Sequence, residues 1–496
     1  MKNKKIYCFG VSGRYINELV NLGLHEQIEA VIELNPKLTG TGSVGGLEYP
    51  ICSPNVIDSL DVLSTSIVVT SSFTADIEEV LRQKNITDEV YRVLTEEDRI
   101  ELQYKERYSQ DALEDIIIFR SGPMEYVPGA DFFDNTRALF EYMLKNQFNL
   151  KYQMVWVVKD PDMIPKEYRA SDVEFISFDW YKNGDEKETE KYFYALFHAK
   201  YIFTTDAFGF MQNVKPEVKR IQLWHGCGFK TRANPTPCEK RYDYMTVISD
   251  CYKEIHVREF GLREEQVLVT GLPRLDWLFQ PYSMSVAEIF GWKKTRKVIF
   301  WVPTFRTAQA DMMHLKESEY RLSSEIGLPL IQNVSQLLHL NSLLQEQDIL
   351  LVVKLHYLQK KDVICKADMS NIVFLEHEDI SCRDIVINRL LAGTDAIISD
   401  YSSIAVDYMV LDRPIGFTLD DVEEYQNKRG FNFDDISEWI PGEKLYNFED
   451  MIQFVKMVAE EKDISAARRK ALLVVMHKYR DDKNCERVLK AFNIMK

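Results

Sequence analysis

The stretch Lys297–Arg306 reads KVIFWVPTFR, and it decides the fold of the C-terminal part of the chain. It begins with a short, unbroken run of apolar and aromatic side chains, which is typical of a strand buried inside a parallel sheet. Pro303 ends this strand because proline has no N–H to donate to a neighbouring strand. Thr304 and Arg306 follow at the carboxyl end, where open parallel sheets bind their ligands. A hydroxyl and a guanidinium at such a turn suit phosphate oxygens.

A second strand of this kind ends in a lysine and a histidine. Residues 349–354 read ILLVVK, and Leu355 and His356 follow. Side chains two positions apart on an extended chain point to the same face, so Lys354 and His356 are expected to point together. They could grip a diphosphate or protonate a leaving group. The alternative is an ordinary strand end at the surface.

A third strand, AIIS at 396–399, runs into Asp400, Tyr401, Ser402 and Ser403. A helical pattern begins at residue 404, which puts the two serines at the N-cap and in the first turn. Their hydroxyls and the free backbone N–H groups there can hold a phosphate. Taken alone, this turn is explained as well by a simple helix cap. We favour a phosphate site because all three turns are predicted at one edge of one sheet.

A separate α/β region occupies residues 114 to about 280. Its apolar strand patterns alternate with helical ones, which predicts another parallel, doubly wound sheet. Two such domains that face each other across a cleft form a GT-B-like arrangement, and the last helices, about 451–496, could pack back across both. The predicted strands of this region are 116–119, 153–158, 173–177, 201–204 and 220–224.

His225 follows the last of these strands, in the stretch QLWHGCGFKT at 222–231. Neutral histidine can accept a proton near pH 7, and a hydroxyl that attacks phosphorus benefits from such a base. The flanking glycines, Gly226 and Gly228, allow the backbone to come close to a ligand. Lys230 can offset developing negative charge. We therefore predict that His225 is a catalytic base, against the alternative of a structural loop histidine.

Other polar residues near these turns are predicted to have supporting roles. Arg274, in GLPRLD at 271–276, is expected to line the hinge between the two domains. Asp407 lies on the helix that follows the serines, where it could simply anchor that helix. The supporting residues are Lys230, Arg274, Asp400, Asp407 and Arg429.

The N-terminal part of the chain is predicted to form a small Rossmann-like unit of its own. Gly10 and Gly13, with Glu33 about twenty residues later, form part of a dinucleotide-binding fingerprint, but the third glycine is missing. A module kept for packing or assembly is therefore favoured over a nucleotide site. The predicted domains are 1–105, 112–285 and 286–496, with a charged linking helix between the first two.

Composition excludes several classes of protein. The formal charge is −16, from 77 acidic and 61 basic residues, so no bulk attraction to nucleic acid or anionic lipid is expected. None of the eight cysteines forms a CxxC pair, and no zinc spacing or paired-carboxylate site is evident, so we predict no metal and no cofactor. No apolar window is long enough to span a membrane. The chain is expected in the cytoplasm, with peripheral attachment to the inner face of the cell membrane left open.

At these motifs the chain resembles the CDP-glycerol glycerophosphotransferase family, the teichoic acid primases and polymerases. The resemblance covers about residues 114–480, and it is specific because several motifs occur in order. The motifs are Trp224–Gly226 with Lys230 and Thr231, Gly271–Asp276, Pro303–Arg306, Lys354–His356, and Ser399–Ser403 continuing through Asp407, Tyr408, Arg413 and Pro414 to Arg429–Phe431.

The resemblance implies a GT-B fold, a donor of CDP-glycerol type, an acceptor hydroxyl on a polymer or lipid-linked chain, and release of CMP. His225 matches the histidine that the family is proposed to use as a base. His356 matches a second histidine, near the donor diphosphate. The resemblance also implies that Thr304, Arg306 and the Asp400–Ser403 turn contact the donor phosphates.

The chain departs from the family pattern beside these same residues. It has HGCGFK at 225–230 where the family usually has HGTPLK, Leu272 where asparagine is usual, and Tyr357 where proline is usual. The histidines remain, so the predicted reaction class is kept, but the polyol and the acceptor stay open. Two other functions also stay open: a sugar-nucleotide glycosyltransferase or epimerase on the same fold, and a non-catalytic assembly protein that binds polymer or nucleotide.

Overall fold

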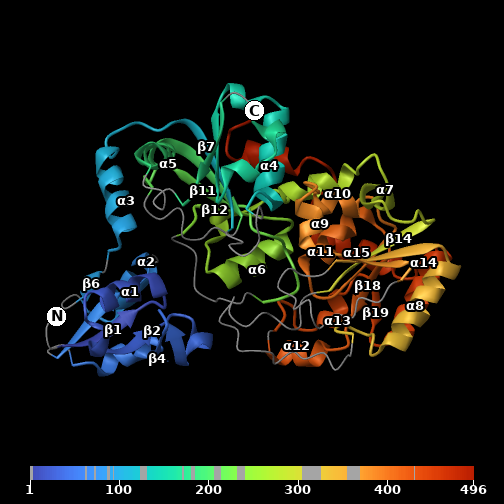
Figure 1. The fold of residues 1–496 in the computed structure, drawn as a ribbon, viewed down its shortest axis with the longest axis horizontal. Coiled ribbons are helices and arrows are strands. Elements are labelled where there is room, and N and C mark those ends of the chain that lie inside the picture. The colour runs from blue at the N-terminus through green and yellow to red at the C-terminus, as the bar shows by residue number, and fades with distance from the viewer. Residues whose placement is uncertain are drawn as a thin grey trace.

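In the part of the chain that it describes, the computed structural model of the protein has three sheets, each with its own helices (Figure 1). Four residues of the predicted site, Thr304, Arg306, His356 and Arg429, lie outside the part of the chain that the structure describes. The described residues are 4–61, 64–71, 74–86, 90–92, 94–122, 131–169, 172–179, 185–205, 214–231, 241–303, 326–354, 369–428 and 430–496.

The first sheet forms the N-terminal unit and has the strand order β3-β4-β2-β1-β5-β6. Only the β3–β4 hairpin is antiparallel. The remaining order runs outward from β1 in both directions, as in doubly wound folds. The elements are β1 Lys5–Phe9, α1 Gly13–Asn21, β2 Ile28–Ile32, β3 Gly40–Val44, β4 Leu47–Cys52, β5 Thr65–Val69, α2 Thr74–Gln83 and β6 Val90–Arg92.

The glycine that ends β1 has a structural role at this unit's strand ends. Gly10 has φ of +112°, and a Cβ on it would lie 2.5 Å from Cβ of Ser71. The ends of β1 and β5 therefore meet so closely that only glycine fits. The expected Rossmann-like unit is confirmed, and close packing explains this glycine without a bound nucleotide.

Helix α3, Glu96–Arg107, connects the N-terminal unit to the second sheet (Figure 1). It begins with a capping box between Thr95 and Asp98. Its Tyr104 ring stacks on Phe193 of helix α5, Glu186–His198, with centroids 4.7 Å apart. The predicted linking helix is therefore docked on the next unit.

The second sheet defines the middle unit and has the order β13-β12-β11-β10-β7-β8-β9, with every pair parallel. Helix α4 packs against β7 and β10, while α5 packs against β7 and β9. The elements are β7 Glu114–Ser121, α4 Asp134–Lys145, β8 Gln153–Val158, β9 Val173–Ser177, α5 Glu186–His198, β10 Ala199–Thr205, β11 Lys219–Gln222, β12 Tyr244–Val247, α6 Asp250–Phe260, β13 Val267–Val269 and the 3₁₀ segment η8 Pro273–Phe279.

The third sheet defines the C-terminal unit and has the order β16-β15-β14-β17-β18-β19, again all parallel. Helices α8 and α14 pack together beside it, and α11 packs on β17. The elements are α7 Val286–Phe290, β14 Lys297–Val302, α8 Val334–Glu346, β15 Ile349–Lys354, β16 Ile372–Leu375, α9 His377–Ser381, α10 Ile387–Leu391, β17 Ala396–Ser399, α11 Ser403–Tyr408, β18 Ile415–Thr418, α12 Val422–Lys428, α13 Ile436–Trp439, β19 Glu443–Leu445, α14 Phe448–Ala459, α15 Ala466–Met476 and α16 Asn484–Ala491.

The strand orders of these two units confirm the predicted fold class, a GT-B-like pair preceded by a Rossmann-like unit. A core strand of each unit buries a tryptophan completely, Trp156 on β8 and Trp301 on β14. The two cores are joined, because Phe229 of the middle unit packs against Phe417 and Phe433 of the C-terminal unit.

The chain returns to the middle unit at its end, and Figure 1 shows the C-terminus beside α4. Helix α16 contacts α4 and η8. The carboxylate of Asp276 accepts hydrogen bonds from the backbone N–H groups of Asn484 and Cys485, at 2.8 and 2.9 Å. By its packing, α16 therefore lies with the middle unit, although its residues fall within the predicted domain 286–496. The domain limits themselves stay predictions.

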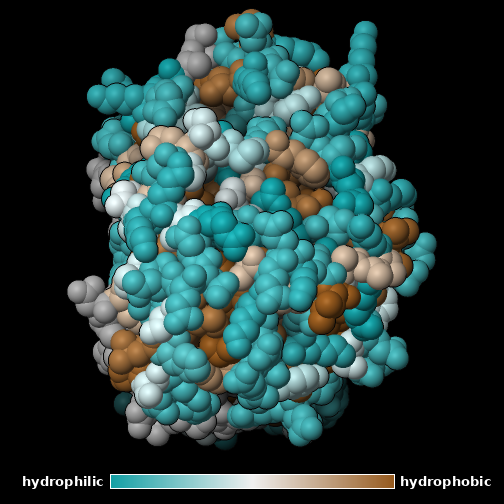
Figure 2. All heavy atoms as spheres, turned by 90° about the vertical axis from the view of Figure 1, so that its right-hand side faces the viewer, coloured by the Kyte–Doolittle hydropathy of each residue, from teal (hydrophilic) through white to brown (hydrophobic). Residues whose placement is uncertain are grey.

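The surface of the C-terminal unit is mostly hydrophilic on the face that Figure 2 shows, with apolar residues in small, separate groups. None of the helices in the described residues combines the length and the apolar character needed to cross a membrane.

Candidate functional site

The loop that carries His225 begins where β11 ends. Trp224 and Gly226 have φ of +57° and +129°, so the backbone on both sides of His225 is in the left-handed region. The side chain of Gln222 accepts a hydrogen bond from N–H of Trp224 at 2.9 Å, and Nδ2 of Asn135 donates to the Trp224 carbonyl at 2.7 Å. These hydrogen bonds stabilise the left-handed backbone of the loop. His225 therefore lies beyond the carboxyl end of β11.

The loop lies against the serine turn of the C-terminal unit. A Cβ on Gly226 would lie 2.5 Å from Oγ of Ser403, and one on Gly228 would lie 3.3 Å from its Cβ. The two glycines predicted to make room for a ligand therefore also make room for the neighbouring unit. The structure thus brings together the loop of His225 and the turn at Ser402 and Ser403, from two different sheets.

Arg274 lies behind this contact and binds to both units. Its Nη1 donates to the carbonyl of His225 at 2.6 Å and to the carboxylate of Asp134 at 3.0 and 3.1 Å. Its Nη2 lies 2.7 Å from Oδ2 of Asp407. Burial raises the pKa of Asp407 to about 6; the charge of Arg274 opposes this shift, and the charge of Asp134 adds to it. The predicted hinge arginine is thus a cross-unit contact inside the candidate site.

The environment of His225 favours the neutral imidazole. The residue is exposed to solvent, yet the surrounding protein desolvates the ring and lowers its pKa to about 4. Asp134 opposes this shift, while Arg274 and Lys230 reinforce it. The Trp224 ring lies beside the imidazole, with centroids 3.9 Å apart.

Lys230 lies in a short ladder that links the two units. The N–H of Asn432 donates to the carbonyl of Phe229 at 2.7 Å, and Nδ2 of Asn432 donates to the carbonyl of Lys230 at 2.8 Å. Nζ of Lys230 lies over the ring of Tyr425, 6.0 Å from its centroid. The segment after His225 is therefore tied by its backbone to the C-terminal unit.

The three strands predicted to carry phosphate-binding turns are neighbours in the sheet. β14 lies between β15 and β17, and Val302 pairs with Ser399. Lys354 ends β15, and burial lowers the pKa of its amine to about 8. Thr304, Arg306 and His356 lie outside the described residues. The described strand ends nevertheless meet at one edge of the sheet, at the point where its strand order reverses.

Among the remaining predicted residues, Ser402 occupies the N-cap position of α11, without a side-chain capping bond. Asp400 is fully buried behind the turn. Sequence reasoning missed Asp134 and Asn135, which begin α4. Asp134 has φ of +61°, and Asn135 is completely buried. An Asp-Asn pair before a helical pattern is read as an ordinary cap, so no local signal distinguishes these two residues.

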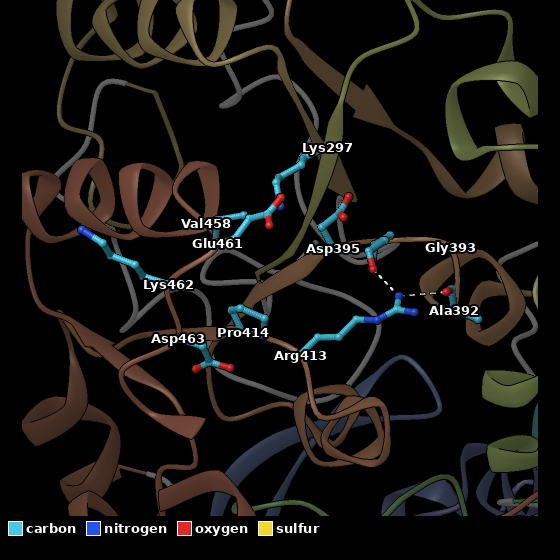
Figure 3. Close-up of a pocket in the computed structure, with 11 residues that line it drawn as sticks. Lys297, Ala392, Gly393, Asp395, Arg413, Pro414, Val458, Glu461, Lys462 and Asp463 are labelled. Carbon is cyan, nitrogen blue, oxygen red and sulfur yellow. Dashed lines mark hydrogen bonds and ion pairs between the residues drawn. The ribbon is translucent and has the colours of Figure 1, made fainter. Parts of the chain in front are cut away.

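The structure also contains a cavity of about 490 Å³ at the opposite edge of the C-terminal sheet (Figure 3). Arg413 extends across it and donates to the carbonyl of Ala392 at 2.9 Å, while Lys297 pairs with Glu461 at 3.2 Å. The amino ends of β14, β17 and β18 line it. Because doubly wound sheets bind ligands at the carboxyl ends of their strands, we do not assign this cavity to the site.

Comparison with known proteins identifies the family of the chain. The model of the family described as CDP-glycerol:poly(glycerophosphate) glycerophosphotransferase matches residues 113–493. The teichoic acid glycerol-phosphate primase of Bacillus subtilis (strain 168) is 25% identical over 342 residues, which are 65% of this chain and 80% of the relative. The teichoic acid ribitol-phosphate primase of Bacillus spizizenii (strain ATCC 23059 / NRRL B-14472 / W23) is 26% identical over 322 residues, 60% of this chain and 76% of the relative.

A solved structure shares the fold. The wall teichoic acid polymerase TagF superposes with a TM-score of 0.59 at 19% identity, over 85% of this chain and 96% of TagF. At that identity the likeness concerns the fold alone. The family model, however, spans most of the chain and includes every motif from Trp224 to Phe431. This chain therefore belongs to the CDP-glycerol:poly(glycerophosphate) glycerophosphotransferase family.

Proposed function

We propose that the protein transfers glycerol phosphate, or a related polyol phosphate, from a CDP-linked donor to a hydroxyl of a cell-surface polymer or its lipid-linked precursor. The observation that carries this proposal is the contact between the His225 loop of the middle unit and the Ser403 turn of the C-terminal unit. A base and an anion-binding turn then face the same reacting group. The relatives named above, which are glycerol-phosphate and ribitol-phosphate primases, support the same reaction class.

In the proposed reaction, the acceptor hydroxyl attacks the phosphorus that bears the polyol. The new oxygen–phosphorus bond forms as the bond to CMP breaks, and the bonding electrons leave with CMP. The hydroxyl proton passes to the imidazole of His225, which is neutral at pH 7 because its pKa is lowered to about 4. A base this weak becomes stronger once a negatively charged donor is bound nearby, since that charge stabilises the imidazolium.

Charge on the transferring group needs stabilisation from the C-terminal unit. We assign this role to Lys354, Ser402 and Ser403, which lie at the carboxyl edge of its sheet. Phosphoryl transfer depends mainly on positioning and on donors aimed at the developing charge. Thr304, Arg306 and His356 complete the proposed donor site.

A donor panel tests the reaction and the polyol. The full chain is incubated with a lipid-linked acceptor and with CDP-glycerol, CDP-ribitol or UDP-sugars, and release of the nucleotide is measured. We expect CMP from one of the CDP-polyols, and a loss of at least ~100-fold in turnover for His225→Ala, the scale of a lost general base. Release of UDP instead would favour the glycosyltransferase reading, and tight CDP binding without turnover would favour a binding protein.

We also propose that the reaction takes place at the cytoplasmic face of the membrane, where a lipid-linked acceptor would present its hydroxyl. Flotation with liposomes that do or do not carry the acceptor tests this proposal. We expect the protein to float only when the acceptor is present, because the acidic chain has no bulk attraction to anionic lipid.

A further inference from the structure

We propose that Arg274, held between Asp134 and Asp407, is a positioning residue that latches the two units together and fixes the His225 loop against the donor-side turn. The catalytic role of Arg274 rests on the proposed function. The contact between the two units can be measured without turnover. We call Arg274, Asp134 and Asp407 the latch.

The latch joins residues from three places in the chain. Asp134 is the first residue of α4, Arg274 lies in η8, and Asp407 lies in α11 of the C-terminal unit. The two terminal nitrogens of the guanidinium bind different units. Nη1 binds Asp134 and the His225 carbonyl of the middle unit, while Nη2 binds Asp407 of the C-terminal unit. A planar fork with fixed donors suits two carboxylates on different sides.

The latch is buried and carries two negative charges for one positive charge. The side chains of Arg274 and Asp134 are 10% and 9% exposed, and that of Asp407 is 1% exposed. If the guanidinium were removed, two desolvated carboxylates from different units would face each other without compensation. Removing one partner of a buried ion pair strongly destabilises the contact between the groups that it joined. We therefore expect the units to move apart when Arg274 is neutralised.

The middle-unit side of the latch is fixed by a second set of bonds. The backbone N–H of Arg274 donates to Oδ1 of Asn135 at 3.0 Å, and Nδ2 of Asn135 donates to the Trp224 carbonyl. The start of α4, the His225 loop and η8 thus form one framework. Within the latch, Asp407 is the residue that the C-terminal unit contributes. A change at Asp407 should therefore loosen the contact of α11 with η8 while leaving the framework around His225 intact.

The chain offers a matched control for a buried arginine between two carboxylates. Arg469 on α15 is completely buried; its Nε donates to Asp412 at 3.0 Å and its Nη2 to Asp463 at 2.5 Å. All three residues come from the C-terminal part of the chain. Arg469→Gln removes a buried arginine from two carboxylates without touching the contact between η8 and α11, so it controls for the loss of such a charge elsewhere in the chain.

The test compares Arg274→Gln, Asp407→Asn and Arg469→Gln in the full chain, each at a temperature below its own Tm. Small-angle X-ray scattering should show a larger radius of gyration for the two latch variants. For Arg469→Gln, the radius of gyration should be unchanged. Turnover should fall ~100-fold in the latch variants, the scale for misplacing a reacting group by about 1 Å. Binding of CMP, which we assign to the C-terminal unit, should be retained.

Asp407→Asn keeps the latch testable if Arg274→Gln does not fold, because it leaves the bond between Arg274 and Asp134 in place. An unchanged radius of gyration in Asp407→Asn would overturn the proposal. So would a loss of turnover in Arg469→Gln that matches its loss in the latch variants. If no donor is turned over by the unaltered chain, the proposed function fails, whereas the scattering and CMP-binding results still decide the latch.

Discussion

At the scale of single residues, the site depends on keeping an imidazole neutral and reachable. His225 is exposed to solvent, yet its pKa is lowered to about 4, because the protein atoms around the ring take part of its hydration away and the charges of Arg274 and Lys230 disfavour the imidazolium. A neutral ring can take a proton at pH 7. The same lowered pKa makes the imidazole a weak base in the free protein, and a negative charge bound nearby would raise its basicity.

Titration by NMR tests this account. With histidine labelled at Cε1 and the His225 signal assigned from the His225→Gln variant, we expect no titration of His225 between pH 5 and pH 8 in the free protein. Since the pKa is lowered, the ring gains a proton only as the pH falls towards 4. Addition of CDP should move the midpoint upward, because its diphosphate favours the charged ring. A midpoint near 6.5 without ligand would contradict the desolvated site.

At the scale of elements, two loops from different sheets share one contact through glycine. Gly226 has φ of +129°, and a Cβ there would collide with Arg274 and with Ser403. The backbone conformation and the lack of space both exclude a side chain. The glycine thus sets how closely the His225 loop approaches α11.

Gly226→Ala should therefore damage both stability and catalysis. We expect a loss of about 1–3 kcal/mol from overpacking and a fall in kcat of ~100-fold from displacement of the loop. Gly291→Ala is the control, because Gly291 has φ of +70° and nothing within 4 Å of an added Cβ. It should cost only about 1 kcal/mol of backbone strain and leave kcat unchanged. Chemical denaturation and CMP release measure the two quantities, and equal effects of the two substitutions would refute the steric argument.

At the scale of the whole molecule, the N-terminal unit docks on the middle unit at a distance from His225. Arg241 lies just before β12, at the amino edge of the middle sheet, and its Nη2 donates to Asp76 of α2 at 2.6 Å. Both side chains are largely buried. His225 follows the carboxyl end of β11, at the other edge of the same sheet. This contact therefore fixes the N-terminal unit without touching the candidate site.

Asp76→Asn should loosen this docking without changing turnover. We expect a weakening of about 1–3 kcal/mol, the scale for taking the charge partner from a buried group. Hydrogen exchange should become faster in α2 and β12, while kcat is unchanged. Asp58→Asn is the control, since the pair of Asp58 and Lys84 lies within one unit with Asp58 mostly exposed, and such pairs contribute little. A parallel fall in kcat for Asp76→Asn would show that the N-terminal unit acts on catalysis.

The sequence by itself determined the kind of fold and the positions of the strand ends. Runs such as KVIFWV and ILLVVK are read locally, because burial on both faces of a parallel strand demands apolar side chains at every position. Turn chemistry is local as well, so the polar residues after β14, β15 and β17 could be named in advance. The order of the motifs also indicated the family. Thr304, Arg306, His356 and Arg429 remain predictions, as does every assigned role.

Only the tertiary structure decided which of these residues meet. Asp134, Arg274 and Asp407 are far apart in the chain, and no periodicity relates them, yet one guanidinium binds both carboxylates. The packing of α16 on the middle unit and the burial of Asp400 are of the same kind. Local sequence patterns indicate which side chains of a segment are buried and which backbone conformation the segment adopts. They do not record which distant segment will supply the opposite charge, because that is settled when the units pack.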